Sequence, residues 1–172
     1  MGVLNRECYD AYVSPLATMS VDRTKCIMIA LEEANKAPIA QGAFSVGCVL
    51  THQNEILSTG YSRELEGNTH AEANAIAKVQ DKSILSQVEL YTTLEPCTVR
   101  TSGLRACTDT IIEYGIKKVF IGVEEPPDFV NCQGVSKLKE AGVDVIFLSS
   151  EEYTRQTGRN LSEDCLIAAR RS

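Results

Sequence analysis

A histidine, a carboxylate and two cysteines stand close to expected helix starts in the middle of the chain. His70 and Glu72 belong to Thr69-His70-Ala71-Glu72, Cys97 ends the segment Glu95-Pro96-Cys97, and Cys107 follows it. Zinc takes nitrogen from His and sulfur from Cys, and catalytic zinc sites keep three protein ligands with a fourth position for water. His70, Cys97 and Cys107 are therefore the candidate metal ligands.

Glu72 is the candidate proton carrier beside that metal. Bound zinc can lower the pKa of water from about 15.7 towards about 7, which makes hydroxide available at neutral pH. Glu72 lies two residues after His70 at the start of the same expected helix. It can face the water without binding the metal. If Pro96 takes the first position of a helix, Cys97 lies in its first turn, where the helix dipole favours a thiolate.

A structural interpretation competes with this one. Thr69 followed by Glu72 has the form of a capping box, in which Glu72 only satisfies a backbone N–H. Taken singly, a histidine or cysteine is more often a surface or core residue than a ligand. A structural zinc domain that binds another protein would need a fourth protein ligand. The only other histidine, His52, lies on an expected hairpin, which favours the catalytic interpretation.

The two cysteines are separated by nine residues, Thr98 to Ala106. In the deaminase signature H-x-E…P-C-x-x-C the separation is two, so both sulfurs lie on one turn. With nine, the chain must bulge outward and re-enter a helix, and Gly103 permits the turn. Arg100, Thr101 and Ser102 in this bulge are candidates for holding a phosphate. A solvated loop is the alternative.

The expected elements bring these residues to one edge of a sheet. Ser20 can cap the first helix, with Asp22 in its first turn. A hairpin followed by alternating strands and helices predicts a mixed sheet with helices on both faces, and such folds bind ligands at one sheet edge. We expect helices over 20–36, 69–78, 104–114 (after a short start at Pro96), 134–141 and from 151 onward, and strands over 44–50, 56–62, 88–92, 117–123 and 143–148.

Composition indicates an ordinary globular protein: 172 residues, 44% hydrophobic, 23% charged, with a net charge of -6. The negative charge argues against nucleic acid as a partner, because phosphate neutralisation needs clustered Lys and Arg. No apolar run approaches the roughly 18 residues of a membrane span, and no secretory signal begins the chain. We therefore expect a cytoplasmic protein with mostly free cysteines, an N-terminal arm over 1–19 and one domain over 20–172.

At these residues the sequence resembles the cytidine-deaminase-like zinc deaminases, and within them the fungal form of the riboflavin-biosynthesis (DRAP) deaminases. The His-Ala-Glu and Pro-Cys elements are shared by the superfamily, and the long gap between the cysteines is typical of the riboflavin branch. The likeness runs over about residues 40–150. Its matching segments are 60–72, 91–97, 100–103 leading to Cys107, 115–119 and 125–130.

The resemblance implies a three-layer α-β-α fold with a mixed five-stranded sheet, a zinc ion on His70, Cys97 and Cys107, Glu72 as proton shuttle, and a homodimer. It implies hydrolytic removal of the 2-amino group of 2,5-diamino-6-ribitylamino-4(3H)-pyrimidinone 5′-phosphate, giving the uracil product and ammonia. This phosphorylated pyrimidine would be the small-molecule partner.

The same resemblance indicates where the substrate would lie. Asn68 and Ser45 are expected to contact it, in addition to the phosphate candidates of the bulge. Bacterial members carry Asn at the position of Ala43 and His at the position of Ser62, so substrate contacts here should differ in detail. A tRNA or free nucleoside or nucleotide deaminase is the alternative enzyme, because it shares the metal site. The acidity counts against tRNA, and the long bulge counts against free cytidine.

Overall fold

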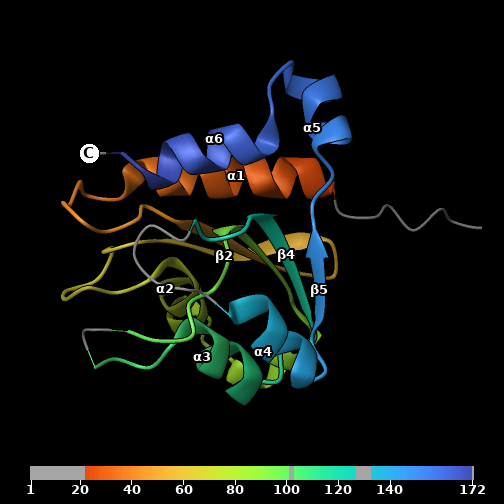
Figure 1. The fold of residues 1–172 in the computed structure, drawn as a ribbon. Helices are drawn as coiled ribbons and strands as arrows, with labels where there is room; N and C mark the ends of the chain where they lie inside the picture. Colours follow the sequence, from red (N-terminus) through yellow and green to blue (C-terminus); the bar gives the residue numbers. More distant parts are fainter. Residues whose placement is uncertain (1–21, 101–102, 127–132, 172) are drawn as a thin grey trace, which may run out of the picture.

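The computed structural model describes residues 22–100, 103–126 and 133–171. It contains a five-stranded sheet between two layers of helices (Figure 1), which confirms the predicted three-layer α/β fold. In chain order the elements are α1 (Arg23–Lys36), β1 (Gly47–His52), β2 (Glu55–Tyr61), α2 (Ala71–Lys78), the 3₁₀ helix η1 (Lys82–Gln87), β3 (Glu89–Leu94), α3 (Cys107–Glu113), β4 (Lys118–Val123), α4 (Gly134–Glu140), β5 (Asp144–Phe147), α5 (Ser150–Thr157) and α6 (Leu161–Ala169).

The sheet is mixed, as predicted. Its strand order is β2-β1-β3-β4-β5. Strand β1 pairs antiparallel with β2 and β3, whereas the central strand β3 runs parallel to β4, and β4 runs parallel to β5. The parallel strands β3 and β4 therefore end at the same edge, and both continue into loops there.

One face of the sheet is covered by α1 and α6, which lie side by side (Figure 1). Tyr91 on β3 and Phe120 on β4 are register partners on this face, and both are fully buried. Their rings stack with centroids 4.5 Å apart, a favourable arrangement for an aromatic pair. Ile27 and Leu161 extend this core into the two helices.

The opposite face is covered by α2, α3 and α4 (Figure 1). Alternate residues of the same strands, such as Leu50, Leu90 and Ile121, form the core here. The helix α2 lies very close to β2, because a Cβ atom on Gly60 would be 2.4 Å from the carbonyl oxygen of Ala71. This close packing fixes the start of α2 next to the sheet edge.

Several predicted bounds shift. The first helix begins at Arg23 with Asp22 as its N-cap, whose carboxylate accepts from Lys25 N at 3.2 Å, and Ser20 lies outside the described residues. No helix starts at Pro96, and the helix predicted over 104–114 begins only at Cys107. The predicted C-terminal helix is two helices, because Gly158 ends α5 with a φ of 73°.

Two further expectations concern the N-terminal arm and the absence of a membrane span. The predicted arm over 1–19 lies outside the described residues, and its boundary with the domain stays a prediction. In the part of the chain that the structure describes, each helix is too short or too polar to cross a lipid bilayer.

Candidate metal centre

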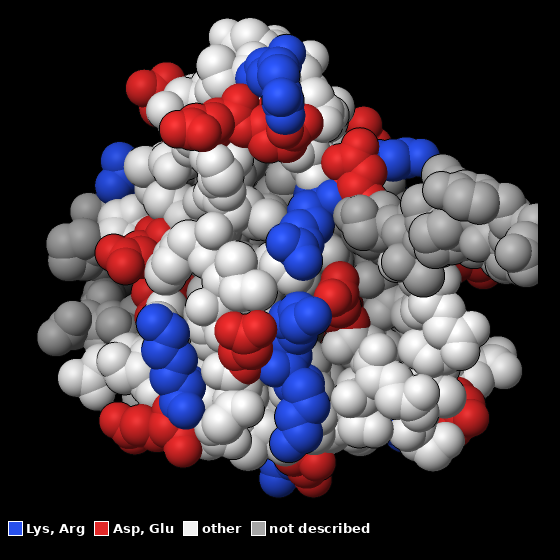
Figure 2. All heavy atoms as spheres, turned by 90° about the vertical axis from the view of Figure 1, so that its right-hand side faces the viewer, with Lys and Arg blue, Asp and Glu red and all other residues white. Residues whose placement is uncertain are grey.

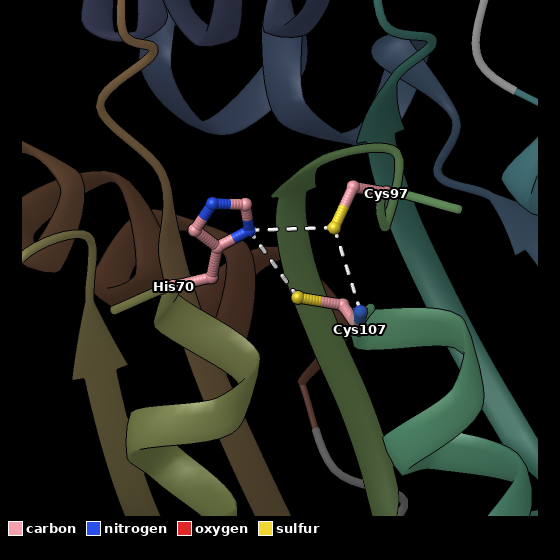
Figure 3. A group of neighbouring side chains, drawn as sticks. All are labelled: His70, Cys97 and Cys107. Atoms are coloured by element: carbon pink, nitrogen blue, oxygen red, sulfur yellow. Dashed lines mark hydrogen bonds between the residues drawn. The ribbon is translucent and has the colours of Figure 1, made fainter. Parts of the chain in front are cut away.

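Three side chains from separate segments converge at one edge of the sheet (Figure 3). His70 is the N-cap of α2, Cys97 follows β3, and Cys107 is the first residue of α3. The Sγ atoms of Cys97 and Cys107 lie 3.4 and 3.5 Å from His70 Nδ1, and the three donor atoms are all within 4.8 Å of one another. Among the described residues, His70, Cys97 and Cys107 are thus the three donors of one candidate metal site.

The donor set fits zinc. Tetrahedral zinc, with Zn–S near 2.3 Å and Zn–N near 2.0 Å, would hold a sulfur and a nitrogen ligand about 3.5 Å apart. The two sulfur–nitrogen distances match this separation. Two sulfurs and one imidazole nitrogen also form a typical ligand set for a catalytic zinc ion, with one position left for water.

Asn74 holds the chain that leads into His70. Its side-chain amide donates to the Tyr61 carbonyl at 2.7 Å and to Thr69 Oγ1 at 3.0 Å. The Thr69 hydroxyl in turn donates to the Leu65 carbonyl, and the N-cap of α2 is His70 without a side-chain cap bond. The capping box that competed for Glu72 is therefore absent.

Cys107, and not Cys97, occupies the first turn of a helix. The prediction that Cys97 lies in the first turn of a helix starting at Pro96 is wrong, because the helix starts at Cys107. Cys97 precedes the helix, and its own groups accept hydrogen bonds from the start of α3. Its Sγ atom accepts from Cys107 N at 3.4 Å, and its carbonyl oxygen accepts from Thr108 N at 3.2 Å and from Thr108 Oγ1 at 3.1 Å. The start of α3 thus positions Cys97 and stabilises negative charge on its sulfur.

The two thiols differ strongly in acidity. Hydrogen bonding from Cys107, helped by His70, lowers the pKa of Cys97 to about 4. The same interaction with Cys97, together with burial, raises the pKa of Cys107 well above its usual value. Cys97 is therefore the thiolate of the pair at neutral pH, and Cys107 keeps its proton. A bound divalent cation would replace that proton, because metal ligation requires the thiolate form.

Glu72 lies directly beside the metal-binding group. It is 3% exposed, its Oε1 accepts from Thr92 Oγ1 at 3.2 Å, and its Oε2 accepts from Cys107 Sγ at 3.3 Å. Burial raises the pKa of the Glu72 carboxyl, and the charge of Cys97 raises it further. A carboxyl with a raised pKa next to a metal-binding group is suited to accepting and releasing a proton.

A pocket opens onto these groups. His70, Glu72 and Cys97 line it, together with an aromatic side chain and further carboxylates. The full set of lining residues is Phe44, Val46, Ser62, His70, Glu72, Leu94, Glu95, Cys97 and Glu125. The pocket therefore combines apolar walls with groups that can exchange protons, as small-molecule sites usually do.

The other predicted substrate contacts are not among the lining residues. Ser45 is fully buried, and its hydroxyl accepts from Arg63 Nη2 at 2.9 Å. Arg100 donates to the backbone carbonyl of Asn68, so these two residues join the loop before α2 to the bulge between the cysteines. Thr101 and Ser102 lie outside the described residues. Substrate contact by these five residues stays a prediction.

Two residues near the site had no role in the sequence interpretation. Thr92 contacts Glu72, and Glu95 accepts hydrogen bonds from the backbone amides of Glu125 and Val135, of which Glu125 lines the pocket. Strand alternation places Thr92 on the same face as Leu90, which is the face that α2 covers. Glu95 directly precedes Pro96-Cys97, but nothing in the sequence shows which groups it would bind.

Comparison with known proteins identifies the family. The model of the cytidine and deoxycytidylate deaminase zinc-binding region matches residues 20–123, which include His70, Glu72, Cys97 and Cys107. The chain belongs to this deaminase family. The predicted resemblance is thereby confirmed, and so is zinc as the expected metal, because the matched region is zinc-binding and contains the three donors.

Individual relatives of this deaminase point to the riboflavin branch. The chain is 43% identical over 143 residues to the diaminohydroxyphosphoribosylamino-pyrimidine deaminase of Schizosaccharomyces pombe, covering 81% of this chain and 33% of that protein. It is 43% identical over 101 residues to riboflavin biosynthesis protein RibD of Actinobacillus pleuropneumoniae, covering 59% of this chain and 26% of RibD. The chain thus spans about a third or less of the length of these relatives.

A solved structure agrees with this assignment. The fold is similar to that of Aspergillus oryzae Rib2 deaminase, whose crystal structure contains DARIPP. The TM-score is 0.67 at 28% identity, and the match covers 86% of this chain and 89% of that one.

Proposed function

We propose that this protein is a zinc-dependent aminohydrolase of riboflavin biosynthesis. Its substrate would be 2,5-diamino-6-ribitylamino-4(3H)-pyrimidinone 5′-phosphate, from which it removes the 2-amino group. The observation that carries the reaction class is the buried Glu72 carboxylate, which contacts Cys107 of the three-donor metal group and lines a pocket together with His70 and Cys97. The name of the Schizosaccharomyces pombe relative, a diaminohydroxyphosphoribosylamino-pyrimidine deaminase, supports a phosphorylated diaminopyrimidine as the substrate, and the name of RibD supports the pathway.

In this proposal three residues bind the metal and Glu72 transfers protons. His70, Cys97 and Cys107 would hold the zinc ion, which when bound makes a water acidic enough to ionise near neutral pH. Oε1 of Glu72 accepts a hydrogen bond from Thr92, and Oε2 is the oxygen that faces the metal donors. Glu72 Oε2 would take a proton from the water and pass it to a ring nitrogen of the substrate.

The reaction then replaces the amino group of the pyrimidine with the oxygen of the water. The water oxygen bonds to the carbon that carries the amino group, and the carbon–nitrogen bond breaks. Glu72 then takes the proton of the new hydroxyl group and gives it to the departing nitrogen, which leaves as ammonia while the carbonyl forms. One water is consumed for each ammonia released, and the pyrimidine gains a carbonyl oxygen.

The substrate contacts belong to the same proposal. Arg100, Thr101 and Ser102 would hold the phosphate, and Asn68 and Ser45 would lie near the rest of the substrate. The bond from Arg100 to the Asn68 carbonyl supports this placement, because it brings the bulge next to the loop that carries His70. An arginine held in this way can offer its remaining N–H groups to a phosphate.

The net charge of -6 favours a small substrate over a nucleic acid. On the face in Figure 2, Lys and Arg side chains of the described residues stand next to Asp and Glu side chains. A polyanion such as tRNA would be bound by clustered basic side chains.

The proposal also includes a location and an assembly. Cys26, Cys48, Cys97, Cys107 and Cys165 are free thiols, which supports a reducing compartment such as the cytoplasm. Leu65, Val99 and Leu104 are exposed on loops near the metal group, and they offer apolar surface to a second copy in a homodimer. Sedimentation velocity would test the dimer.

Ammonia release from a panel of substrates tests the proposed function. Zinc-loaded protein should release ammonia from the ribityl substrate at a kcat/KM at least about a hundredfold above that for cytidine or dCMP, since a site built for one substrate's polar groups rejects analogues that lack them. The family model names cytidine and deoxycytidylate, so preference for either would replace the substrate and keep the reaction class. Release from none of the three would reject the proposal.

A further inference from the structure

Glu95 is a buried carboxylate beside a metal ligand, and the chemistry above does not use it. It is 8% exposed and stands between the end of β3 and Pro96-Cys97. Its Oε1 accepts from Val135 N at 2.9 Å, and its Oε2 accepts from Glu125 N at 3.3 Å. These two amides lie at opposite ends of the connection between β4 and α4, so one side chain ties both ends to the cysteine loop.

The junction around Glu95 is tightly packed. The Glu95 N–H donates to the Val123 carbonyl at the end of β4, at 3.1 Å. A Cβ atom on Gly134 would lie 2.1 Å from the carbonyl oxygen of Pro96, so only glycine fits there without displacement. The ends of β3 and β4 and the start of α4 therefore meet at this carboxylate.

A carboxylate suits this position because both of its oxygens are acceptors and both meet an N–H donor. None of the ion pairs among the described residues includes Glu95. Its negative charge is therefore held by backbone amides, and a buried polar group without such partners would be costly.

We call the two hydrogen bonds from the amides of Glu125 and Val135 to Glu95 the Glu95 clamp. This clamp shapes the pocket and does not position the metal donors. Glu95 and Glu125 both line the pocket. Cys97 is held separately, because Thr108 donates to its carbonyl from the other side. Losing the bond to Glu125 would therefore move a pocket wall while the metal donors stay in place.

We propose that Glu95 is a positioning residue for substrate binding, which fixes the Glu125 side of the pocket by holding both ends of the β4–α4 connection. The inference rests on the proposed function for the identity of the substrate. The clamp itself can be measured without turnover.

The test compares wild-type protein with Glu95→Gln. The glutamine has the same shape, but one of the two amides would then face an NH₂ group in place of an acceptor. KM for the ribityl substrate should rise about tenfold, as expected for the loss of a hydrogen bond to a charged group. The kcat should stay within about threefold, since the substitution removes binding and not chemistry. Zinc content should stay unchanged, and the amides of Glu125 and Val135 should exchange hydrogen faster.

Asp164→Asn is the matched control. Asp164 is a carboxylate of similar burial, 7% exposed, on α6 in the other helical layer. It accepts from Tyr153 Oη at 2.5 Å and pairs with Arg159 at 2.6 Å. Its loss should lower the melting temperature and leave KM and the exchange of the Glu125 and Val135 amides unchanged.

Three results would overturn the proposal: loss of zinc in Glu95→Gln, a lower kcat at unchanged KM, or an equal rise of KM in Asp164→Asn. If wild-type protein does not turn over the ribityl substrate, the proposed function fails, and unchanged amide exchange in Glu95→Gln is then the result that overturns the clamp. If Glu95→Gln does not fold, Glu95→Asp serves instead. It keeps the charge but is too short to reach both amides, so the same changes are expected.

Discussion

Thr92 Oγ1 lies 3.2 Å from Oε1 of Glu72, and both side chains are buried. A hydroxyl has one proton, and Thr92 also lies 3.0 Å from the Leu94 carbonyl, so it can donate to one of the two acceptors at a time. When it donates to Glu72 it fixes the carboxylate with Oε2 towards Cys107.

Thr92→Val keeps the shape of the side chain and removes this donor. Because a hydrogen bond to a charged group contributes about 1.5 kcal/mol or more, kcat should fall about tenfold while zinc stays bound. Thr92→Ser restores the hydroxyl and should restore most of kcat. Steady-state kinetics on both variants decide this, and a valine variant with wild-type kcat would show that Thr92 does not orient Glu72.

The metal-free protein should become more stable when Glu72 is replaced by Gln. Burial raises the pKa of the Glu72 carboxyl in the folded state, whereas in the unfolded chain it titrates near 4.3, about the model-peptide value. The folded state then holds the proton more tightly. The destabilisation is absent below the unfolded pKa, grows as pH rises through it, and is complete above the folded pKa.

Calorimetry on chelator-treated protein measures this effect. The melting temperature of Glu72→Gln should exceed that of wild type at weakly alkaline pH, and the difference should shrink in weakly acidic buffer. A difference that does not change with pH would contradict a buried, ionised Glu72.

Among the cysteines that the structure describes, Cys97 should be the reactive thiol of the metal-free protein. Its pKa of about 4 makes it a thiolate at neutral pH, and it is only partly buried. The buried thiols Cys26, Cys48, Cys107 and Cys165 all have raised pKa values and should resist alkylation.

Iodoacetamide labelling with peptide mass spectrometry tests this. Alkylation of Cys97 should be constant across neutral pH and slow down as pH falls towards its pKa, because the thiolate is the nucleophile. Added zinc should protect it. Equal labelling with and without zinc would show that Cys97 is not a ligand.

Two glycines of the sheet allow the effect of α2 on the metal group to be separated from general stability. A Cβ on Gly60 would lie 2.4 Å from Ala71 O in α2, and one on Gly47 would lie 1.8 Å from Ala30 O in α1. Overpacking of this kind costs about 1–3 kcal/mol, so both alanine variants should melt at lower temperature.

Zinc affinity should differ between the two variants. Gly60→Ala displaces the helix that follows His70 and carries Glu72, whereas α1 contributes no metal donor. Competition with a chromophoric chelator should therefore show weaker zinc binding for Gly60→Ala than for Gly47→Ala. Equal affinities would contradict the idea that the packing of α2 on β2 sets the geometry of the metal group.

The sequence allowed the metal donors and the layered fold to be predicted because both leave local signals. His70, Cys97 and Cys107 stand where strands end or helices begin, and the alternation of strands and helices implies a sheet edge where they meet. The helix bounds were less predictable. Leu104 continued the apolar pattern of α3, but it is 47% exposed and lies before the helix, so it is not part of the buried face of α3.

Contacts made across the fold left no comparable signal. Thr92 is one threonine among several in a strand, and only the packing of α2 reveals that it meets Glu72. The partners of Glu95 are backbone amides, which any residue type can supply. The break between α5 and α6 did have a signal, since Gly158 is followed by Asn160, which caps α6.

The most direct test of the central claim is ammonia release from the ribityl substrate by wild-type protein and Glu72→Gln, each with its zinc content measured. Zinc-loaded wild type should release one ammonia for each deaminated pyrimidine formed. Glu72→Gln should retain zinc and lose turnover by a factor of at least about 1,000, because the proton carrier acts in more than one step. Wild-type turnover in Glu72→Gln with zinc bound would contradict the account.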